Sequence, residues 1–127
     1  GDENSLPSDF LPFAERYPEI RLLLAHLGNG GGAAGDPSTQ VRAIQASTQG
    51  NVYVDTSSAR SIMPQLVEWA VGEIGADRIL YGTDTPLYSA EMQRARIDHA
   101  ELTDDQKKLI LRDNAVALLD LPGDNLS

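Results

Sequence analysis

The chain has 127 residues, of which 41% are hydrophobic and 23% are charged, a composition that suits one globular domain with a modest core. A formal net charge of −9 repels phosphate backbones, which argues against nucleic acid as a partner, and the lack of a long apolar run argues against a membrane span. Cysteine is absent, which excludes disulfides and thiolate chemistry, so a bound metal would need imidazole and carboxylate ligands.

Helical and extended patterns alternate along the chain. Pro18 ends the first helix, and Asp36-Pro37-Ser38 is a strong signal for the start of the second. In chain order the predicted elements are a helix from Ser8 or Asp9 to about Tyr17, a strand over Ile20–Leu27, a helix from Pro37 to about Ser47, a strand over 51–54 ending at Asp55, a helix over roughly Met63–Ile74, a strand over Arg78–Tyr81, a helix from Ser89 to about His99, and closing helices from Thr103 to Leu119.

Several local signals refine these elements. The run IRLLLAHL at Ile20–Leu27 is typical of a strand that is covered on both faces. Gly75 is expected to cap its helix in the left-handed conformation. Thr103 and Gln106 predict a capping box, and a kink is expected near Asp113–Asn114. Alternating strands and helices of this length predict an α/β fold with a parallel sheet and right-handed crossovers.

Polar residues follow all three predicted strands: His26, Asp55 and the turn Gly82-Thr83-Asp84-Thr85-Pro86. Working residues of parallel sheets gather at the carboxyl ends of the strands. His26 taken alone could be a core histidine bonded to a backbone carbonyl, and Asp84 could be a turn or cap aspartate. Together, an imidazole and a carboxylate at one end of a sheet can meet at one cation or one water, with the carboxylate as a general base.

The other polar candidates have simpler explanations. Asp55 is expected to accept hydrogen bonds from the backbone of Ser57 or Ser58, although substrate contact is an alternative. Tyr88 and Arg94 could reach a substrate carboxylate, but a surface role is favoured for both. His99 is predicted to be a solvated helix residue, and Trp69 is expected to pack against the sheet.

Three segments carry a resemblance to a known family: LLLAHLG at Leu22–Gly28, NVYVDTS at Asn51–Ser57 and DRILYGTDTP at Asp77–Pro86. They resemble the amidohydrolase-related branch of the amidohydrolase superfamily, and the tail over Leu102–Leu121, with its Asn114-Ala115 pair, looks like the closing helices of that family. The resemblance covers nearly the whole chain.

The resemblance implies the C-terminal part of a (β/α)8 TIM barrel that holds a divalent metal, with Zn as the first expectation and Mn or Mg as alternatives. His26 matches the histidine that ends strand six, which binds metal or holds the reacting water and carbonyl. Asp84 matches the strand-eight aspartate, a metal ligand and proton acceptor. Both residues are therefore expected to be catalytic residues and metal ligands.

The chain also departs from the family pattern. The His-x-His pair of strand one and the histidine of strand five are absent, and Gly1-Asp2 resembles the residues just after that histidine. One histidine and one carboxylate are too few ligands for tight metal binding. Residues 1–121 are therefore expected to form part of a barrel domain, followed by a tail over 122–127, and to be inactive alone.

The implied function is a metal-dependent hydrolase that acts on a small molecule, with a non-oxidative decarboxylase on the same scaffold as one alternative. Another is a non-catalytic half-barrel that forms homo-oligomers or associates with the missing half, since three strands leave two open edges and an uncovered inner face. A third is a dinucleotide-binding domain, because Gly30-x-Gly32-x-x-Gly35 follows a strand and Asp55 lies about twenty residues beyond it. A cytoplasmic location is the default expectation.

Overall fold

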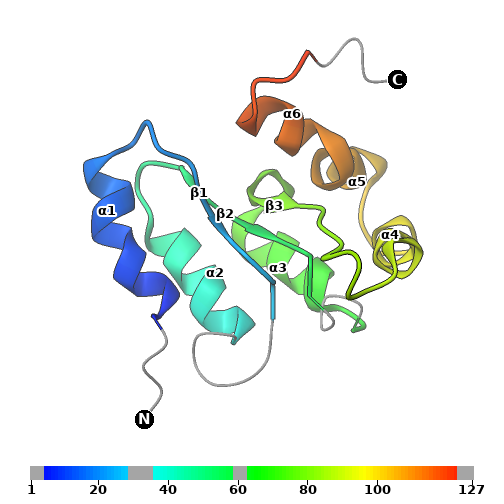
Figure 1. The fold of residues 1–127 in the computed structure, drawn as a ribbon. Coiled ribbons are helices and arrows are strands. Elements are labelled where there is room, and N and C mark those ends of the chain that lie inside the picture. Colours follow the sequence, from blue (N-terminus) through cyan, green and yellow to red (C-terminus); the bar gives the residue numbers. More distant parts are fainter. Residues whose placement is uncertain (1–4, 29–35, 59–62, 123–127) are drawn as a thin grey trace.

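A computed structural model describes residues 5–28, 36–58 and 63–122, which form an α/β fold on a parallel sheet (Figure 1). Within these residues the sheet has three strands in the order β1 (Leu22–Leu24), β2 (Val52–Asp55) and β3 (Ile79–Leu80). Leu22 pairs with Val52, and Val54 pairs with Ile79, both in parallel register. The predicted fold class and the order of strands and helices are confirmed.

Helices connect the strands and follow the last one, with α4, α5 and α6 gathered on the β3 side of the sheet (Figure 1). The elements are the 3-10 helix η1 (Pro7–Phe10), α1 (Leu11–Arg16), α2 (Pro37–Ala46), α3 (Leu66–Ile74), the 3-10 helix η4 (Ala76–Arg78), α4 (Ala90–Asp98), α5 (Asp104–Lys108), the π-helical turn η5 (Leu109–Asp113) and α6 (Asn114–Leu118).

The predicted caps account for where α2 and α5 begin. The Asp36 carboxylate accepts a hydrogen bond from the Ser38 N–H at 2.8 Å, with Pro37 in the first helical position. The Thr103 hydroxyl and the Gln106 side chain form the reciprocal capping box, with hydrogen bonds of 3.1 and 2.9 Å. The break expected near Asp113–Asn114 corresponds to the π-helical turn η5, which ends at Asp113.

Two helix boundaries differ from the prediction. The helix expected from Met63 begins at Leu66, because the preceding Gln65 has a φ of 68°, outside the right-handed helical region. Gly75 does have a positive φ of 85°, but its ψ of 151° is extended, so it is not the left-handed cap that we expected. It leads directly into η4.

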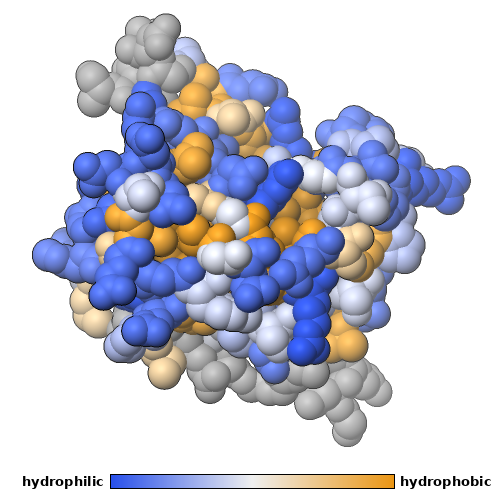
Figure 2. Space-filling model, turned by 180° about the vertical axis from the view of Figure 1, so that it is seen from behind, coloured by the Kyte–Doolittle hydropathy of each residue, from blue (hydrophilic) through white to orange (hydrophobic). Residues whose placement is uncertain are grey.

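Strand β1 is shorter and less covered than the apolar run suggested. It spans Leu22–Leu24 rather than Ile20–Leu27, and Leu23 is 41% exposed while its two neighbours pack against the core. Side chains alternate between the faces of a strand, so only one face of β1 is covered within the described chain. Viewed from behind, the molecule shows a band of apolar residues across its middle (Figure 2). The continuous apolar run therefore predicted a strand correctly, but it did not predict that one face of this strand is uncovered within the described chain.

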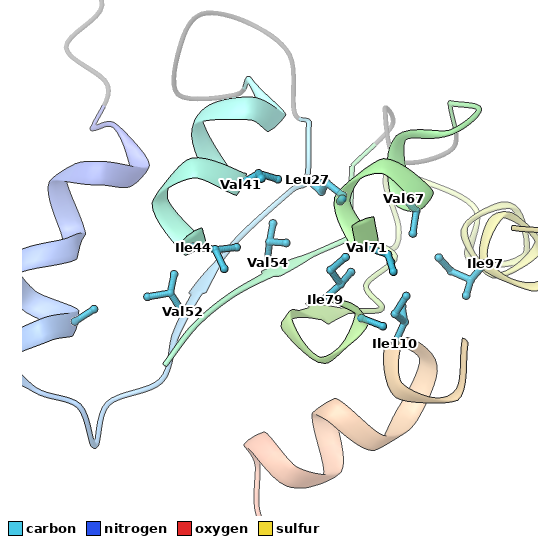
Figure 3. Close-up of a cluster of buried hydrophobic side chains, with 13 residues drawn as sticks. Leu27, Val41, Ile44, Val52, Val54, Val67, Val71, Ile79, Ile97 and Ile110 are labelled. Atoms are coloured by element: carbon cyan, nitrogen blue, oxygen red, sulfur yellow. The ribbon is translucent and has the colours of Figure 1, made fainter. Parts of the chain in front are cut away.

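The core lies between the covered face of the sheet and the helices (Figure 3). Val52, Val54 and Ile79 project from the strands and are at most 1% exposed. Side chains from the helices and from one turn complete the cluster. These are Val41 and Ile44 of α2, Val67 and Val71 of α3, Ile97 of α4, Ile110 of η5, and Leu27 after β1. This packing fixes the strand ends relative to α2 and α4, the helices that support the candidate site.

Trp69 does not pack against the sheet as predicted. Its side chain is 38% exposed, and it lines an apolar hollow of about 350 Å³ together with Met63 and Leu66. The inward-facing positions of α3 are instead filled by smaller residues, Val67 and Ala70, which are fully buried. The outward position of the indole follows from the 3.6-residue period, which places residue 69 beside the buried stripe rather than within it.

An ion pair joins α3 to α4. Glu68 binds the Arg96 guanidinium, accepts a hydrogen bond from the Glu101 N–H at 3.1 Å, and is 19% exposed in its side chain. Burial alone would raise the pKa of Glu68, but the hydrogen bonds from Arg96 and the backbone, with the positive charge of Arg96, outweigh it and hold that pKa below its usual value.

We expect Glu68→Gln to lower the free energy of unfolding by about 1–2 kcal/mol at pH 7, because a charge-assisted hydrogen bond to a mostly buried guanidinium is lost. A carboxyl whose pKa is lower in the folded state stabilises the fold above its unfolded pKa, and this stabilisation disappears as the pH falls through the folded value. The difference between variant and parent should therefore vanish at strongly acidic pH. Urea denaturation at several pH values measures it.

The exposed Glu19 provides the matched control, since Glu19→Gln should change stability little at any pH. An equal loss for Glu68→Gln at neutral and strongly acidic pH would contradict a role for the ionised carboxylate.

No helix in the described part of the chain is long and apolar enough to cross a membrane.

Candidate active site

The three strands are parallel, so their carboxyl ends lie at the same edge of the sheet. His26 follows β1 by two residues, Asp55 ends β2, and Gly82 follows β3 by two residues. Strand β2 lies between the other two, so residues after β2 can contact residues after both neighbours. The polar residues that the sequence singled out are thus carried by adjacent strand ends.

The His26 backbone is held on both sides. Its φ of 66° is in the left-handed region, which a non-glycine residue adopts at some cost in free energy. Its N–H donates to the Asp55 carboxylate at 3.0 Å, and its carbonyl accepts from the buried Gln40 amide of α2 at 3.0 Å. The same Gln40 accepts from the Gly28 N–H at 3.0 Å. These bonds explain how the unusual backbone conformation of His26 is maintained.

The His26 ring contacts Ser57, which lies two residues beyond the end of β2. Nδ1 is 2.9 Å from the Ser57 carbonyl oxygen and 3.1 Å from the Ser57 hydroxyl oxygen. Bonding to a backbone carbonyl is what we expected of a purely structural histidine, but it occupies only one ring nitrogen. Among the described residues, no protein group bonds Nε2, so this atom can contact a metal, a water or a substrate.

Asp55 bonds the backbone of Ser57, as predicted, with the Ser57 N–H donating at 2.9 Å. The same carboxylate oxygen also accepts from the Ser57 hydroxyl and from the His26 N–H. With one oxygen fully engaged in this way, Asp55 supports its neighbours at the strand ends.

Asp84 lies on the loop between β3 and α4, with a left-handed φ of 53° and a half-buried side chain. The Leu87 N–H donates to its carbonyl at 2.9 Å, and the hydroxyls of Thr83 and Thr85 are 2.7 Å apart. Among the described residues, no hydrogen bond or ion pair engages the Asp84 carboxylate. The convergence of Asp84 and His26 on one point therefore stays a prediction.

Tyr81 ties down the loop that carries Asp84. Its N–H donates to the Ile110 carbonyl at 2.9 Å, and its hydroxyl donates to the Ala90 carbonyl, at the start of α4, at 3.0 Å. Burial raises the pKa of the Tyr81 hydroxyl, so it remains a donor at neutral pH. The loop is thus anchored where it leaves β3 and where it enters α4.

Gly82 packs the exit of β3 closely against the exit of β2. Its N–H and carbonyl both contact the Thr56 hydroxyl, at 3.2 and 3.3 Å. A Cβ added at Gly82 would lie 2.9 Å from the Ser57 Cβ and 3.5 Å from the Asp55 Cγ. Only glycine allows this approach, so the loop of Asp84 and the residues that hold His26 are in direct contact.

The described residues do not form a complete metal site. They contain no group of three or more histidine, aspartate or glutamate side chains that could hold a metal ion. A histidine that bonds a carbonyl through one ring nitrogen and leaves the other available is typical of a metal ligand, and a carboxylate without a protein partner is another suitable donor. His26 and Asp84 thus each carry a donor group of a kind that divalent cations bind, and their meeting at one ion stays a prediction.

Other sequence candidates lie outside this arrangement. Arg94 pairs with Asp98 of its own helix at 3.0 Å, and His99 is exposed at the end of α4, as predicted. The Gly30-x-Gly32-x-x-Gly35 pattern lies outside the described residues.

The roles of Ser57, Gln40 and Gly82 in supporting His26 were not predicted from the sequence. Two of them had visible signals. Gln40 lies four residues before Ile44 on the buried face of α2, where a polar residue requires partners, and Gly82 interrupts an apolar strand. The role of Ser57 had no local signal, because it depends on the pairing of β1 with β2.

Comparison with known proteins adds a family and a fold. The model of the family described as Amidohydrolase matches residues 3–121. No curated protein matches the chain significantly.

Solved structures of similar fold include a 2,6-dihydroxybenzoate decarboxylase from Rhizobium (21% identity, TM-score 0.65), covering 87% of this chain and 38% of that one. Another is a dihydroxybenzoic acid decarboxylase from Polaromonas sp. JS666 with bound manganese and 2-nitroresorcinol (23% identity, TM-score 0.66, 91% and 39% covered). A third is amidohydrolase 2 from Bifidobacterium longum subsp. infantis (22% identity, TM-score 0.64, 94% and 47% covered). The chain thus spans less than half the length of the structures it matches.

Proposed function

Since this chain belongs to the amidohydrolase family, we propose that it contributes His26 and Asp84 to the metal-dependent active site of a TIM-barrel enzyme that decarboxylates a small hydroxylated aromatic acid. The observation that carries the proposal is the arrangement of His26 after β1, with Nε2 bonded by no described residue, and Asp84 after β3, at one edge of a parallel sheet. Carboxyl ends of parallel barrel strands form the active face of such barrels.

Hydrolysis is the first expectation from the sequence. Decarboxylation is now favoured over it, because several of the matched structures are decarboxylases of hydroxylated benzoates. Manganese is correspondingly favoured over zinc, since one of these structures holds it. The family description and the Bifidobacterium structure keep hydrolysis as the second candidate. Both reactions need a polarising cation and a group that moves a proton, and the fold does not choose between them.

Each residue has a defined part in the proposed reaction. A bound divalent cation would hold substrate oxygens and offset their negative charge. In decarboxylation the ring carbon that bears the carboxylate gains a proton, and its bond to the carboxyl carbon then breaks to release CO₂. The Asp84 carboxyl delivers that proton to the ring carbon, whereas in hydrolysis its carboxylate would accept a proton from the attacking water. His26 orients the substrate through Nε2.

The rest of the barrel is supplied by a further segment. The exposed Leu23 on the uncovered face of β1, and the free edges of β1 and β3 within the described residues, provide the surface on which that segment would close the barrel. Without it, the chain is expected to associate with itself through the same surface.

The test is to assemble the chain with a segment that supplies the remaining strand–helix units, and to measure CO₂ release from 2,6-dihydroxybenzoate with Mn²⁺. We expect Mn²⁺-dependent turnover that a chelator abolishes. His26→Gln should reduce the turnover at least about 10²-fold, as for a lost catalytic contact. His99→Gln, the change at the exposed histidine, should leave it unchanged.

Two outcomes would count against the proposal. Turnover of an amide or lactone panel without CO₂ release would favour the hydrolase. A well-assembled barrel that binds no metal and turns over neither class would favour the non-catalytic subunit.

A further inference from the structure

The contacts of the His26 ring determine which of its nitrogens carries the proton. Nδ1 is 2.9 Å from the Ser57 carbonyl oxygen, and a carbonyl oxygen can only accept a hydrogen bond. Nδ1 must therefore be the donor, and a neutral ring then leaves Nε2 with its lone pair available.

The direction of the neighbouring bonds agrees with this assignment. An ionised Asp55 can only accept, so the Ser57 hydroxyl donates its hydrogen to that carboxylate. The lone pairs of the Ser57 hydroxyl then remain to face His26 Nδ1, which lies 3.1 Å away. The Nδ1–H group thus faces two acceptor oxygens, both on Ser57, and neither of these oxygens has a hydrogen to donate to Nδ1.

Asp55 holds this arrangement in place. One of its oxygens accepts hydrogen bonds from the Ser57 N–H at 2.9 Å, from the His26 N–H at 3.0 Å and from the Ser57 hydroxyl. A single carboxylate therefore fixes both the main chain that carries the imidazole and the residue that bonds it.

We propose that Asp55 and Ser57 are positioning residues, which hold His26 as the Nδ1–H tautomer so that Nε2 is the atom presented to metal or substrate. The binding of metal or substrate by Nε2 rests on the proposed function, whereas the assignment of the Nδ1–H tautomer does not. Gly82 belongs to the same arrangement, because a side chain at that position would displace Ser57.

The chain has two histidines, so nitrogen NMR can assign the tautomer of each one directly. We would label the histidines of the full chain with ¹⁵N and record two-bond hydrogen–nitrogen correlations at about pH 8.5, above the usual range of imidazole. His26 is expected to show a protonated Nδ1 and an unprotonated Nε2. The exposed His99 should show averaged values for both nitrogens. An Nε2–H or averaged His26 in the folded chain would overturn the proposal.

Two glycine variants test the role of Ser57 without altering His26, Asp55 or Ser57. Gly82→Ala should shift His26 toward a mixture of tautomers, because the new Cβ would lie 2.9 Å from the Ser57 Cβ. Gly72→Ala, on α3 with nothing within 4 Å of the added Cβ, should leave the tautomer unchanged. An unchanged His26 tautomer in a folded Gly82→Ala chain would contradict the role of Ser57.

Variants of Asp55 complete the test. Asp55→Ala should lose the fixed tautomer, while Asp55→Asn, which keeps one acceptor oxygen, should largely retain it; equal effects of the two would contradict the role of Asp55. If His26 has the expected tautomer but His26→Gln leaves turnover of the assembled barrel unchanged, the proposed function fails and the positioning network stands.

Discussion

Asp84→Asn is expected to lower kcat of the assembled barrel by about 10²–10⁴-fold, the range associated with loss of a proton-transfer group. Asparagine has nearly the shape of aspartate, but it can neither carry and deliver the proton nor contribute negative charge to a cation. Because no described residue bonds the Asp84 carboxylate, the substitution should break no internal contact. Steady-state CO₂ release measures the effect, and thermal unfolding of the chain should be little changed.

Asp105→Asn, an exposed carboxylate in α5, is the control and should leave kcat unaltered. An Asp84→Asn barrel with undiminished turnover would exclude Asp84 from the reaction. A variant that loses activity together with its fold would assign Asp84 to the structure of the loop.

Asn51→Asp is expected to be the most destabilising of the conservative substitutions, with a loss of about 3–5 kcal/mol at pH 7. The Asn51 amide is buried, and its nitrogen donates to the carbonyls of Ala14, Tyr17 and Ile20, the last at 2.7 Å. These bonds tie the end of α1 to the start of β1. A carboxylate in that place would direct negative charge at three carbonyl oxygens.

The loss should be smaller at acidic pH, because a protonated carboxyl can donate to one of those carbonyls and burial favours the neutral form. A carboxyl with a raised pKa in the folded state destabilises the fold as the pH rises, so the deficit of Asn51→Asp should grow from mildly acidic to neutral pH. Gln65→Glu makes the same amide-to-carboxylate change on an exposed residue and should cost little. Urea denaturation that ranks the two variants equally would contradict the role of Asn51.

Local signals in the sequence predicted the parts of the fold that are determined locally. Asp36-Pro37 and the Thr103–Gln106 pair each satisfy the N–H groups of their own helix, so their effect does not depend on the rest of the chain. Asn114 was recognised only through a family resemblance. The structure gives it a physical role, because its amide donates to the carbonyls of Ala76 and Ile79 at 2.7 and 2.8 Å.

The sequence singled out His26 and Asp84 as candidate reactive groups, which stay predictions, but not the residues that hold them. His26 and Asp84 were identifiable because a polar residue after an apolar strand is unusual and parallel strands end together. Ser57 and Gln40 act across the fold, at separations of 31 and 14 residues from His26. Such contacts arise from strand register and helix packing, which a single sequence does not specify.

The most direct test of the central claim is a crystal structure of the assembled barrel with Mn²⁺, in which anomalous scattering locates the ion. We expect one manganese site at the carboxyl edge of the sheet, with the Asp84 carboxylate among its ligands and His26 Nε2 directed at the ion or at a molecule bound to it. A manganese ion distant from both side chains, or a packed layer between the His26 imidazole and the Asp84 carboxylate, would contradict the central claim.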